Sequence, residues 1–274
     1  MMIQTQRHTY TGANGRKSLY EITSCPAHQE LVFFVHGFMG FMDWGAWHLV
    51  GDFFTNAGFD FCRFNLSHNG GTPADPIDFP DTEAFGQNTY SKELFDISSV
   101  LNHLEARHRT YQKIHLIGHS RGGGMAILAA QQWQQVSPLG QVCTWAAICD
   151  IARRFPQGQE LEQWKETGVR YVKNGRTLQD LPQFFELYVD FERNKIKLDI
   201  KAAAKDIGKR LHIFLGDQDT SVPISEAYEL QEVSGVEVNE IKAADHVFGA
   251  VHPWTQVSLP TFLEDLCKKT LEKL

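Results

Sequence analysis

The sequence has no hydrophobic run long enough to span a bilayer. Its continuous apolar stretches, such as Leu31–Val35, are far shorter than the roughly 20 residues that a membrane-spanning helix needs. Residues 1–10 are polar and do not resemble a signal peptide. Lys and Arg form no long run and the formal net charge is -7, whereas a nucleic-acid surface needs clustered basic residues. We therefore expect a protein without a membrane span and without a nucleic-acid partner.

Cysteine is scarce and is not arranged for a metal site or a disulfide framework. The five cysteines are odd in number and show no metal-type spacing; they are Cys25, Cys62, Cys143, Cys149 and Cys267. Cys62 and Cys143 lie inside apolar segments, where a thiol serves as a small core residue. Free thiols are typical of a reducing compartment, so we expect a cytoplasmic protein that binds no metal.

Apolar segments alternate with amphipathic segments along most of the chain. Strands are predicted over 3–10, 17–23, 31–35, 59–66, 113–117, 142–149, 211–215 and 236–241, and helices over 47–57, 92–108, 121–134, 224–233 and 254–272. Ser91 is the predicted N-cap of the helix over 92–108. The alternation predicts an α/β fold with a mostly parallel central sheet and helices on both faces. A length of 274 residues suits one such domain over 1–274.

Residues 151–205 interrupt this alternation. They are rich in charged and aromatic side chains and contain no clear buried strand. We expect a mainly helical insertion that follows the strand over 142–149. Its aromatic side chains either line a pocket or pack the insertion onto the core, and the sequence leaves both roles open.

The sequence Gly118-His119-Ser120-Arg121-Gly122 carries the strongest chemical signal. It lies between a predicted strand and a predicted helix, which is the context that a G-x-S-x-G nucleophile turn requires. A side chain at Gly118 or Gly122 would clash with the neighbouring strand or helix, so glycine is needed at both positions. Such a turn lifts the Ser120 hydroxyl above the edge of the sheet, beside the first amides of the helix.

A second loop, His36-Gly37-Phe38-Met39-Gly40, follows the buried strand over 31–35. Attack by a serine on a carbonyl creates an oxyanion that needs two backbone donors. We expect these donors to be the amide of Arg121, directly after the serine, and the amide of Phe38. His36 stands at the end of a strand and is interpreted as a structural histidine.

Two further loops supply candidates for an acid and a base. Asp217 and Asp219 both follow the apolar segment 211–215, and a carboxylate is needed to orient a catalytic histidine. His246 follows the strand over 236–241, so that Ser120, the aspartate and His246 occur in the order expected for this chemistry. Two rival histidines are less suitable. His119 should point away from the turn, and His252 precedes Pro253 and should open the last helix.

These motifs, in this order, resemble the α/β-hydrolase superfamily, and within it the serine-esterase and serine-aminopeptidase-like groups. The resemblance runs from His36 to His246. It implies the α/β-hydrolase fold, and it implies that residues 151–205 form a helical cap. In relatives the acid stands three residues after a glycine, which here favours Asp219 after Gly216 over Asp217.

The resemblance also implies a serine hydrolase that cleaves an ester, with Ser120, Asp219 and His246 as its triad and without a metal or organic cofactor. The expected partner is a small, partly apolar acyl ester, and a homodimer is left open. Two alternatives stay open. One is another acyl transfer on the same triad, as in a peptidase, thioesterase or acyltransferase. The other is a non-catalytic ligand-binding protein of the same fold. The Arg121 side chain either meets an anionic substrate group or makes structural contacts.

Overall fold

An eight-stranded sheet forms the centre of the computed structural model, which describes residues 2–134 and 138–274. The strand order is β1-β2-β4-β3-β5-β6-β9-β10. The strands are β1 (Gln4–Thr11), β2 (Lys17–Ser24), β3 (Glu30–Val35), β4 (Asp60–Phe64), β5 (Lys113–His119), β6 (Leu139–Trp145), β9 (Leu211–Gly216) and β10 (Val238–Ile241). β2 pairs antiparallel with β1 and β4, and the pairs from β4 through β10 are parallel. The predicted α/β-hydrolase fold with a mostly parallel sheet is confirmed.

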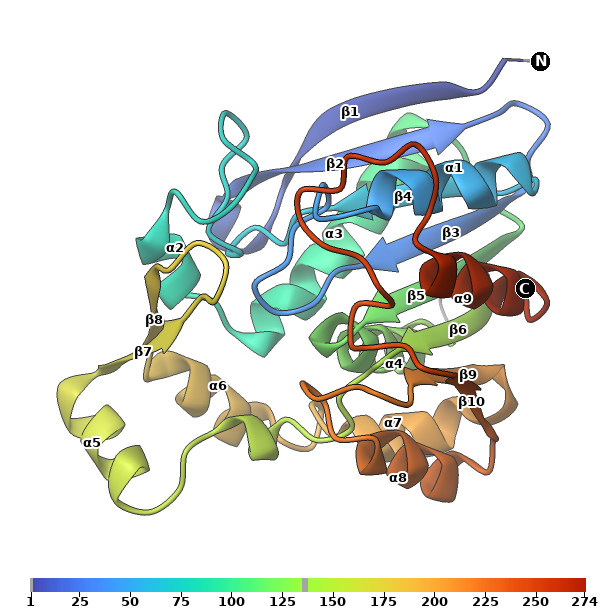
Figure 1. Cartoon of the computed structure of the whole chain (residues 1–274). Coiled ribbons are helices and arrows are strands. Elements are labelled where there is room, and N and C mark those ends of the chain that lie inside the picture. The colour runs from blue at the N-terminus through green and yellow to red at the C-terminus, as the bar shows by residue number, and fades with distance from the viewer. Residues whose placement is uncertain (1, 135–137) are drawn as a thin grey trace.

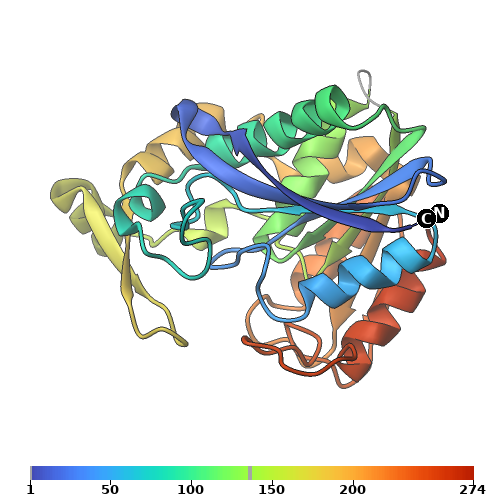
Figure 2. The ribbon, with the colours of Figure 1, turned by 90° about the horizontal axis from the view of Figure 1, so that it is seen from above.

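Helices cover both faces of this sheet (Figures 1 and 2). One face carries α1 (Trp47–Asn56) and α9 (Thr261–Leu271). The other face carries α3 (Tyr90–Arg107), α4 (Arg121–Trp133), α7 (Ile200–Ile207) and α8 (Ser225–Ser234). Other short elements are α2 (Thr82–Gly86) and the 3-10 turns η1 (Ala13–Gly15), η2 (Ala152–Arg154) and η3 (Gly208–Arg210).

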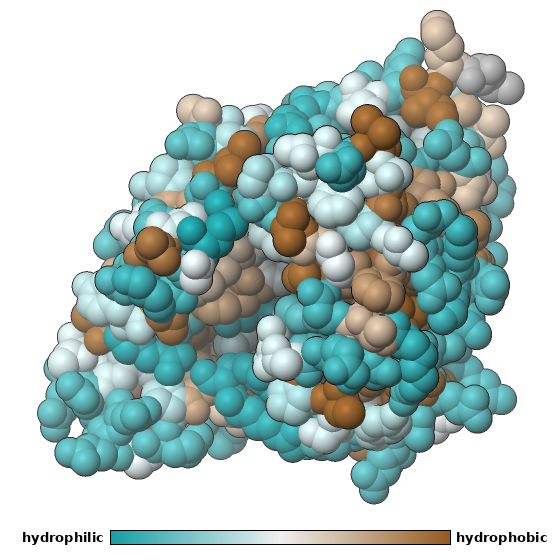
Figure 3. Space-filling model, in the orientation of Figure 1, coloured by the Kyte–Doolittle hydropathy of each residue, from teal (hydrophilic) through white to brown (hydrophobic). Residues whose placement is uncertain are grey.

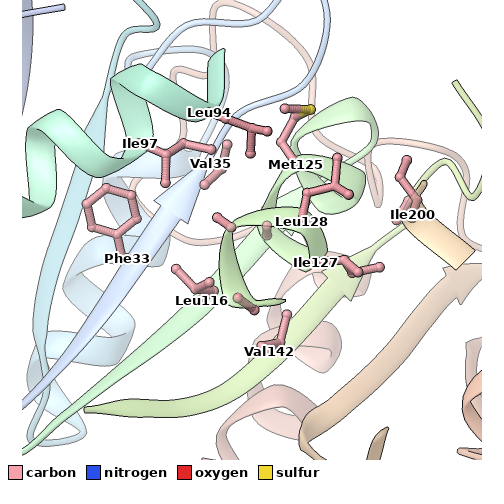
Figure 4. Packing of buried hydrophobic residues seen from close by; sticks show 14 of the residues in the cluster. Phe33, Val35, Leu94, Ile97, Leu116, Met125, Ile127, Leu128, Val142 and Ile200 are labelled. Carbon is pink, nitrogen blue, oxygen red and sulfur yellow. The ribbon is translucent and has the colours of Figure 1, made fainter. Parts of the chain in front are cut away.

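The two helix layers enclose two separate hydrophobic clusters because successive strand side chains point to opposite faces. In β3, Phe33 and Val35 pack with α3 and α4, whereas Phe34 packs with α1 and α9. Figure 4 shows the first cluster, in which Met125 and Leu128 of α4 lie over the sheet. Burial of each large apolar side chain contributes about 1.5–3 kcal/mol, so these clusters hold α4 firmly on the sheet.

Residues 151–205 contain a two-stranded sheet as well as helices. After η2 come α5 (Gln159–Thr167), β7 (Val169–Lys173), β8 (Asp180–Phe184) and α6 (Glu186–Asn194), and β7 pairs antiparallel with β8. The sequence analysis did not predict this hairpin. β7 is half-exposed, so it lacks a continuous apolar run, and Pro182 in β8 argues against a strand at the sequence level. α7, near the end of the same range, packs in the layer of α4 and α8.

Among the predicted boundaries that differ from the structure, three have a specific local reason. The N-cap of α3 is Thr89, whose hydroxyl accepts from the Lys92 amide at 3.3 Å, and not Ser91. β6 ends at Trp145 rather than at residue 149, because Ala146 has a φ of 52° and leaves the extended conformation. α9 begins at Thr261, directly after Pro260, rather than at residue 254.

β5 and α4 meet at a junction with no room for a side chain. A Cβ at Gly118 would lie 2.3 Å from the Gly122 carbonyl oxygen. A Cβ at Gly122 would lie 2.3 Å from the Val35 carbonyl oxygen. Both obstacles are backbone atoms, which cannot rotate away, so the two glycines fix how closely the helix approaches the sheet.

We therefore expect Gly118→Ala to destabilise the protein by about 2–4 kcal/mol, since the added methyl group forces the backbone of α4 away from β5. Urea unfolding measures this loss. Gly175→Ala is the matched control, because a Cβ at Gly175 meets nothing within 4 Å and its effect should stay within about 0.5 kcal/mol. A Gly118→Ala protein as stable as the unsubstituted chain would contradict the account of this junction.

Candidate active site

Ser120 occupies the sharp turn between β5 and α4. Its φ of 57° and ψ of -123° are strained for a residue with a side chain. The surrounding backbone holds it there: the Ser120 amide donates to the Trp145 carbonyl at 2.8 Å, and the Ser120 carbonyl accepts from the Gly123 amide at 3.0 Å. The turn thus has the strained geometry that the sequence predicted for a serine between two close-packed glycines.

The backbone amides of Phe38 and Arg121 lie beside this serine. Arg121 is the first residue of α4, and Phe38 lies in the loop after β3. A Cβ at Gly37 would lie 3.0 Å from Ser120 Cβ, so this loop is pressed against the serine. Within residues 2–134 and 138–274, neither the Phe38 amide nor the Arg121 amide donates a hydrogen bond. Both are therefore available to an acceptor beside Ser120.

Asp219 and His246 come together from the loops after β9 and β10. His246 Nδ1 donates to Asp219 Oδ2 at 2.7 Å. The other carboxylate oxygen, Oδ1, accepts from the amides of Ser221 at 2.7 Å and Val222 at 3.0 Å. Burial opposes ionisation of Asp219, but the hydrogen bonds from His246, Val222 and Ser221 outweigh it and hold the pKa of Asp219 below its ordinary value. The carboxylate thus stays charged and fixes the orientation of the imidazole.

Asp217, the other candidate acid, has a different role. Its Oδ1 accepts from the Ala243 amide at 2.7 Å, and its Oδ2 lies 3.7 Å from Lys242 Nζ. These contacts close the turn after β10. Of the two aspartates, only Asp219 contacts His246 among the described residues.

His119 lies closer to the site than the sequence suggested. Its Nε2 donates to the His246 carbonyl at 2.8 Å, and the two rings are 4.8 Å apart between centroids. The prediction that it points away is wrong, because the loop that carries His246 folds back over β5. Burial, together with the nearby His246, lowers the pKa of His119 to about 3, so it is neutral at ordinary pH and supports the backbone at position 246.

His252 and His36, the other two histidines considered in the sequence, make structural contacts. His252 lies in the loop before α9, where its Nδ1 accepts from the Gly45 amide at 2.9 Å, so it does not open the helix as predicted. His36 donates from Nδ1 to the Gly37 carbonyl at 2.9 Å and accepts at Nε2 from the Leu66 amide at 3.2 Å. Burial lowers the pKa of His36 to about 4. Its structural interpretation agrees with these contacts.

Ser120 and His246 both line two cavities, of about 420 Å³ and 290 Å³. The hydrogen bonds among the described residues do not include one between Ser120 Oγ and His246 Nε2. Such bonds are often long without substrate and tighten when it binds. Since Nδ1 is occupied by Asp219, Nε2 is the nitrogen left to receive a proton.

The larger cavity lies between the core and the hairpin of β7 and β8. Trp44 and Trp47 line one part of it, and Asn174 to Arg176, at the hairpin tip, line another. Figure 3 shows the molecule in the orientation of Figure 1. This face is hollowed where less polar residues lie deep among hydrophilic ones. The sequence analysis missed Asn174 to Arg176 as lining residues, because only the unpredicted hairpin brings them to the serine.

Arg154 was also missed. It ends the turn η2 and lines the smaller cavity together with Ser120 and His246. Its position beyond the end of β6, beside the carboxyl ends of the parallel strands, is the one signal that the sequence offered.

In the described part of the chain, no cluster of three or more His, Cys, Asp or Glu side chains is arranged to hold a metal ion. In the same residues, every helix is too short or too polar to cross a bilayer.

Solved structures with the same fold include several hydrolases. A putative hydrolase from Agrobacterium vitis S4 is 18% identical, with a TM-score of 0.74, over 100% of this chain and 99% of that one. Est1E from Butyrivibrio proteoclasticus with ferulic acid bound is 18% identical, with a TM-score of 0.70, over 97% of each chain. An esterase domain from a Rhodothermus marinus protein is 16% identical, with a TM-score of 0.61, over 90% of this chain and 91% of that one. At such identities the likeness shows the fold alone.

The family comparison is more specific. No curated protein sequence matches the chain. A family model described as serine aminopeptidase, S33, matches residues 26–183, which are more than half of the chain and include the turn at Ser120. Asp219 and His246 lie beyond the matched range. The chain therefore belongs to the serine aminopeptidase (S33) family of α/β hydrolases.

Proposed function

We propose that the chain is a serine hydrolase that cleaves an ester through an acyl-enzyme on Ser120. The observation that carries this proposal is the 2.7 Å hydrogen bond from His246 to Asp219 at a site that His246 shares with the strained Ser120. A carboxylate bound to Nδ1 holds the imidazole in the tautomer whose Nε2 accepts a proton, and it stabilises the imidazolium that results. This is the arrangement that activates a serine hydroxyl.

The reaction then proceeds in two halves. His246 Nε2 accepts the hydroxyl proton of Ser120 as Oγ attacks the carbonyl carbon of the ester. The bond to the leaving alcohol breaks, and protonated His246 donates its proton to that alcohol. Water attacks the acyl-enzyme with His246 as base, which releases the acid and restores Ser120. These steps use only groups of the chain and water.

The amides of Phe38 and Arg121 are the proposed oxyanion donors. Each intermediate places a negative charge on the former carbonyl oxygen, and two fixed backbone donors stabilise that charge more than they stabilise the uncharged carbonyl. In the part of the chain that the structure describes, neither amide has another acceptor, and this supports the role. Because the donors are backbone groups, their contribution depends on the loop conformation rather than on the side chains.

The proposed substrate is a small, partly apolar acyl ester. Aromatic side chains, among them Trp44 and Trp47, line the larger cavity and suit an apolar group. Esterases are among the structural neighbours, one of them with ferulic acid bound. We further propose that residues 151–205 act as a cap, since Asn174 to Arg176 line the cavity that contains Ser120.

A peptidase is the second candidate, because the matching family is described as serine aminopeptidase. The same residues would attack an amide, with His246 donating its proton to the leaving amine. A series of p-nitrophenyl esters compared with an aminoacyl p-nitroanilide separates the two functions. Hydrolysis of the anilide at a higher kcat/KM than any ester would favour the peptidase.

Ser120→Ala should lower kcat by at least about 10³-fold and abolish labelling by a fluorophosphonate probe, since no other group can form the acyl-enzyme. Ester hydrolysis and gel-based labelling measure the two effects. Ser225→Ala, at an exposed serine outside both cavities, is the control and should label normally. Labelling that persists in Ser120→Ala would count against the proposed nucleophile.

Asp219→Asn should lower kcat by about 10⁴-fold, because an amide reverses the tautomer preference of His246. Asp217→Asn should lower it by less than about tenfold, since the side chain of Asp217 contacts Gln218, Lys242 and Ala243 rather than His246 in the described structure. Each variant replaces one carboxylate oxygen by an amide nitrogen, so each serves as the control for the other. A larger loss of kcat in Asp217→Asn than in Asp219→Asn would identify Asp217 as the acid of the triad.

At low pH, the fall in kcat/KM should follow the protonation of a single group. Protonated His246 cannot accept the proton of Ser120, so activity falls as pH falls. The neighbouring histidines do not contribute above about pH 5, because the pKa values of His119 and His36 are lowered to about 3 and about 4. A plot of log kcat/KM against pH should therefore rise with a slope of one. A slope of two would require a second titrating group.

A further inference from the structure

The smaller cavity beside Ser120 is lined by two guanidinium groups. Arg121 and Arg154 reach it from α4 and η2, and Ile148 and Val222 add apolar surface. None of the described residues that line it carries a carboxylate. In the larger cavity, by contrast, the one arginine of the lining, Arg176, is paired with Asp78.

Arg154 is held at this cavity by a buried carboxylate. Its guanidinium pairs with Glu226 of α8, which is only 1% exposed, while the arginine side chain keeps 24% of its surface accessible. Burial lowers the pKa of Arg154 below its ordinary value, so part of its hydration has been lost. Glu226 pairs with Nη2 and the Asp150 carbonyl accepts from Nε at 3.5 Å, which leaves Nη1 without an acceptor among the described residues.

Arg121 is only weakly paired. Its Nη1 lies 3.4 Å from Glu93, and its guanidinium stacks over the Phe38 ring at 4.0 Å. Burial raises the pKa of Glu93, which weakens the carboxylate as a counter-ion. Contact with Phe38 also ties Arg121 to the loop that supplies one proposed oxyanion donor.

The charged side chains in the lining of this cavity are the two arginines. A third guanidinium, that of Arg170, donates from Nη2 to the Arg154 carbonyl at 3.2 Å. The carboxylates that pair with Arg121 and Arg154 or lie close to them, those of Glu93, Asp150 and Glu226, are not among the described lining residues. The Tyr90 ring lies 5.0 Å from the Arg121 guanidinium, and its buried hydroxyl has no hydrogen-bond partner among the described residues. An anionic group in the cavity would add a second acceptor to guanidinium groups that are largely removed from water.

We propose that the smaller cavity binds a carboxylate of the substrate, with Arg154 as its main contact and Arg121 as a second one. The preferred substrate is then an ester that carries a free carboxylate on a short chain, with Ile148 and Val222 contacting the methylene groups. Guanidinium groups suit this task because they bind a carboxylate through two parallel hydrogen bonds. This inference rests on the proposed ester hydrolysis and specifies its substrate class.

Two pairs of esters test the proposal. The first pair is mono-p-nitrophenyl glutarate, which carries a carboxylate in its acyl group, and its neutral analogue p-nitrophenyl pentanoate. The second pair is 3-carboxyphenyl butyrate, which carries a carboxylate in its alcohol group, and its neutral analogue phenyl butyrate. The measured quantity is the ratio of kcat/KM within each pair. We expect a ratio above about ten in at least one pair, and we expect Arg154→Gln to reduce that ratio on the order of 10- to 100-fold, mainly through KM. Arg154→Lys should retain part of it.

Arg153→Gln is the matched control. Arg153 is the neighbouring residue, but its guanidinium binds the partly exposed Glu229 at 2.7 Å, and Arg153 is not among the residues that line the cavity. The control should leave the ratio unchanged. Arg154→Gln removes the cationic partner of the buried Glu226 and leaves its carboxylate with the hydrogen bond from the Cys149 amide at 2.8 Å. The double variant Arg154→Gln/Glu226→Gln is therefore the alternative if the single variant does not fold, and it should lose the preference equally.

The outcomes separate the two proposals. If the unsubstituted protein hydrolyses none of the four esters, the proposed function fails. If it hydrolyses neutral and carboxylate esters equally well, or if Arg154→Gln slows both members of a pair by the same factor, the carboxylate site alone is overturned and Arg154 is a structural residue.

Discussion

Close contact between the backbones of β3, β5 and α4 is the constraint on which the rest of the structure depends. Gly118 and Gly122 leave no room for a Cβ, and this forces Ser120 into its strained turn. Strain of this kind costs about 1–3 kcal/mol and persists only where the surroundings hold it. Here the hydrophobic clusters on both faces of the sheet hold α4 and β5 in place. The same packing exposes the Ser120 hydroxyl and presses the loop after β3 against it.

The parallel sheet explains why four separate loops meet at this serine. The carboxyl ends of β3, β5, β9 and β10 lie at one edge of the sheet, and the loop after each of these strands contributes one part of the site. Asp219 and His246 are fixed there by hydrogen bonds to backbone groups as well as to each other, including the bond from His119 to the His246 carbonyl. A site built in this way is preorganised, so little reorganisation is left for the reaction itself.

Much of this architecture could be predicted from the sequence, because continuous apolar runs identify buried strands and G-x-S-x-G identifies the turn. The hairpin of β7 and β8 could not, since both strands are short, β7 is partly exposed and β8 contains Pro182. Arg154 was missed, and the direction of His119 was predicted wrongly, for a related reason. Which way a side chain turns near the end of the sheet depends on contacts with residues distant in sequence, here Glu226 of α8 and His246. Sequence spacing carries no information about such contacts.

Ser120 is proposed to carry the acyl group between the two halves of the reaction. This can be measured by intact-mass and peptide-mass spectrometry after acid quenching of a reaction with p-nitrophenyl trimethylacetate, whose bulky acyl group slows deacylation. We expect one added trimethylacetyl group, located on the peptide that contains Ser120 and absent from Asp219→Asn. An acyl group found on another residue during productive turnover would rule out Ser120 as the nucleophile.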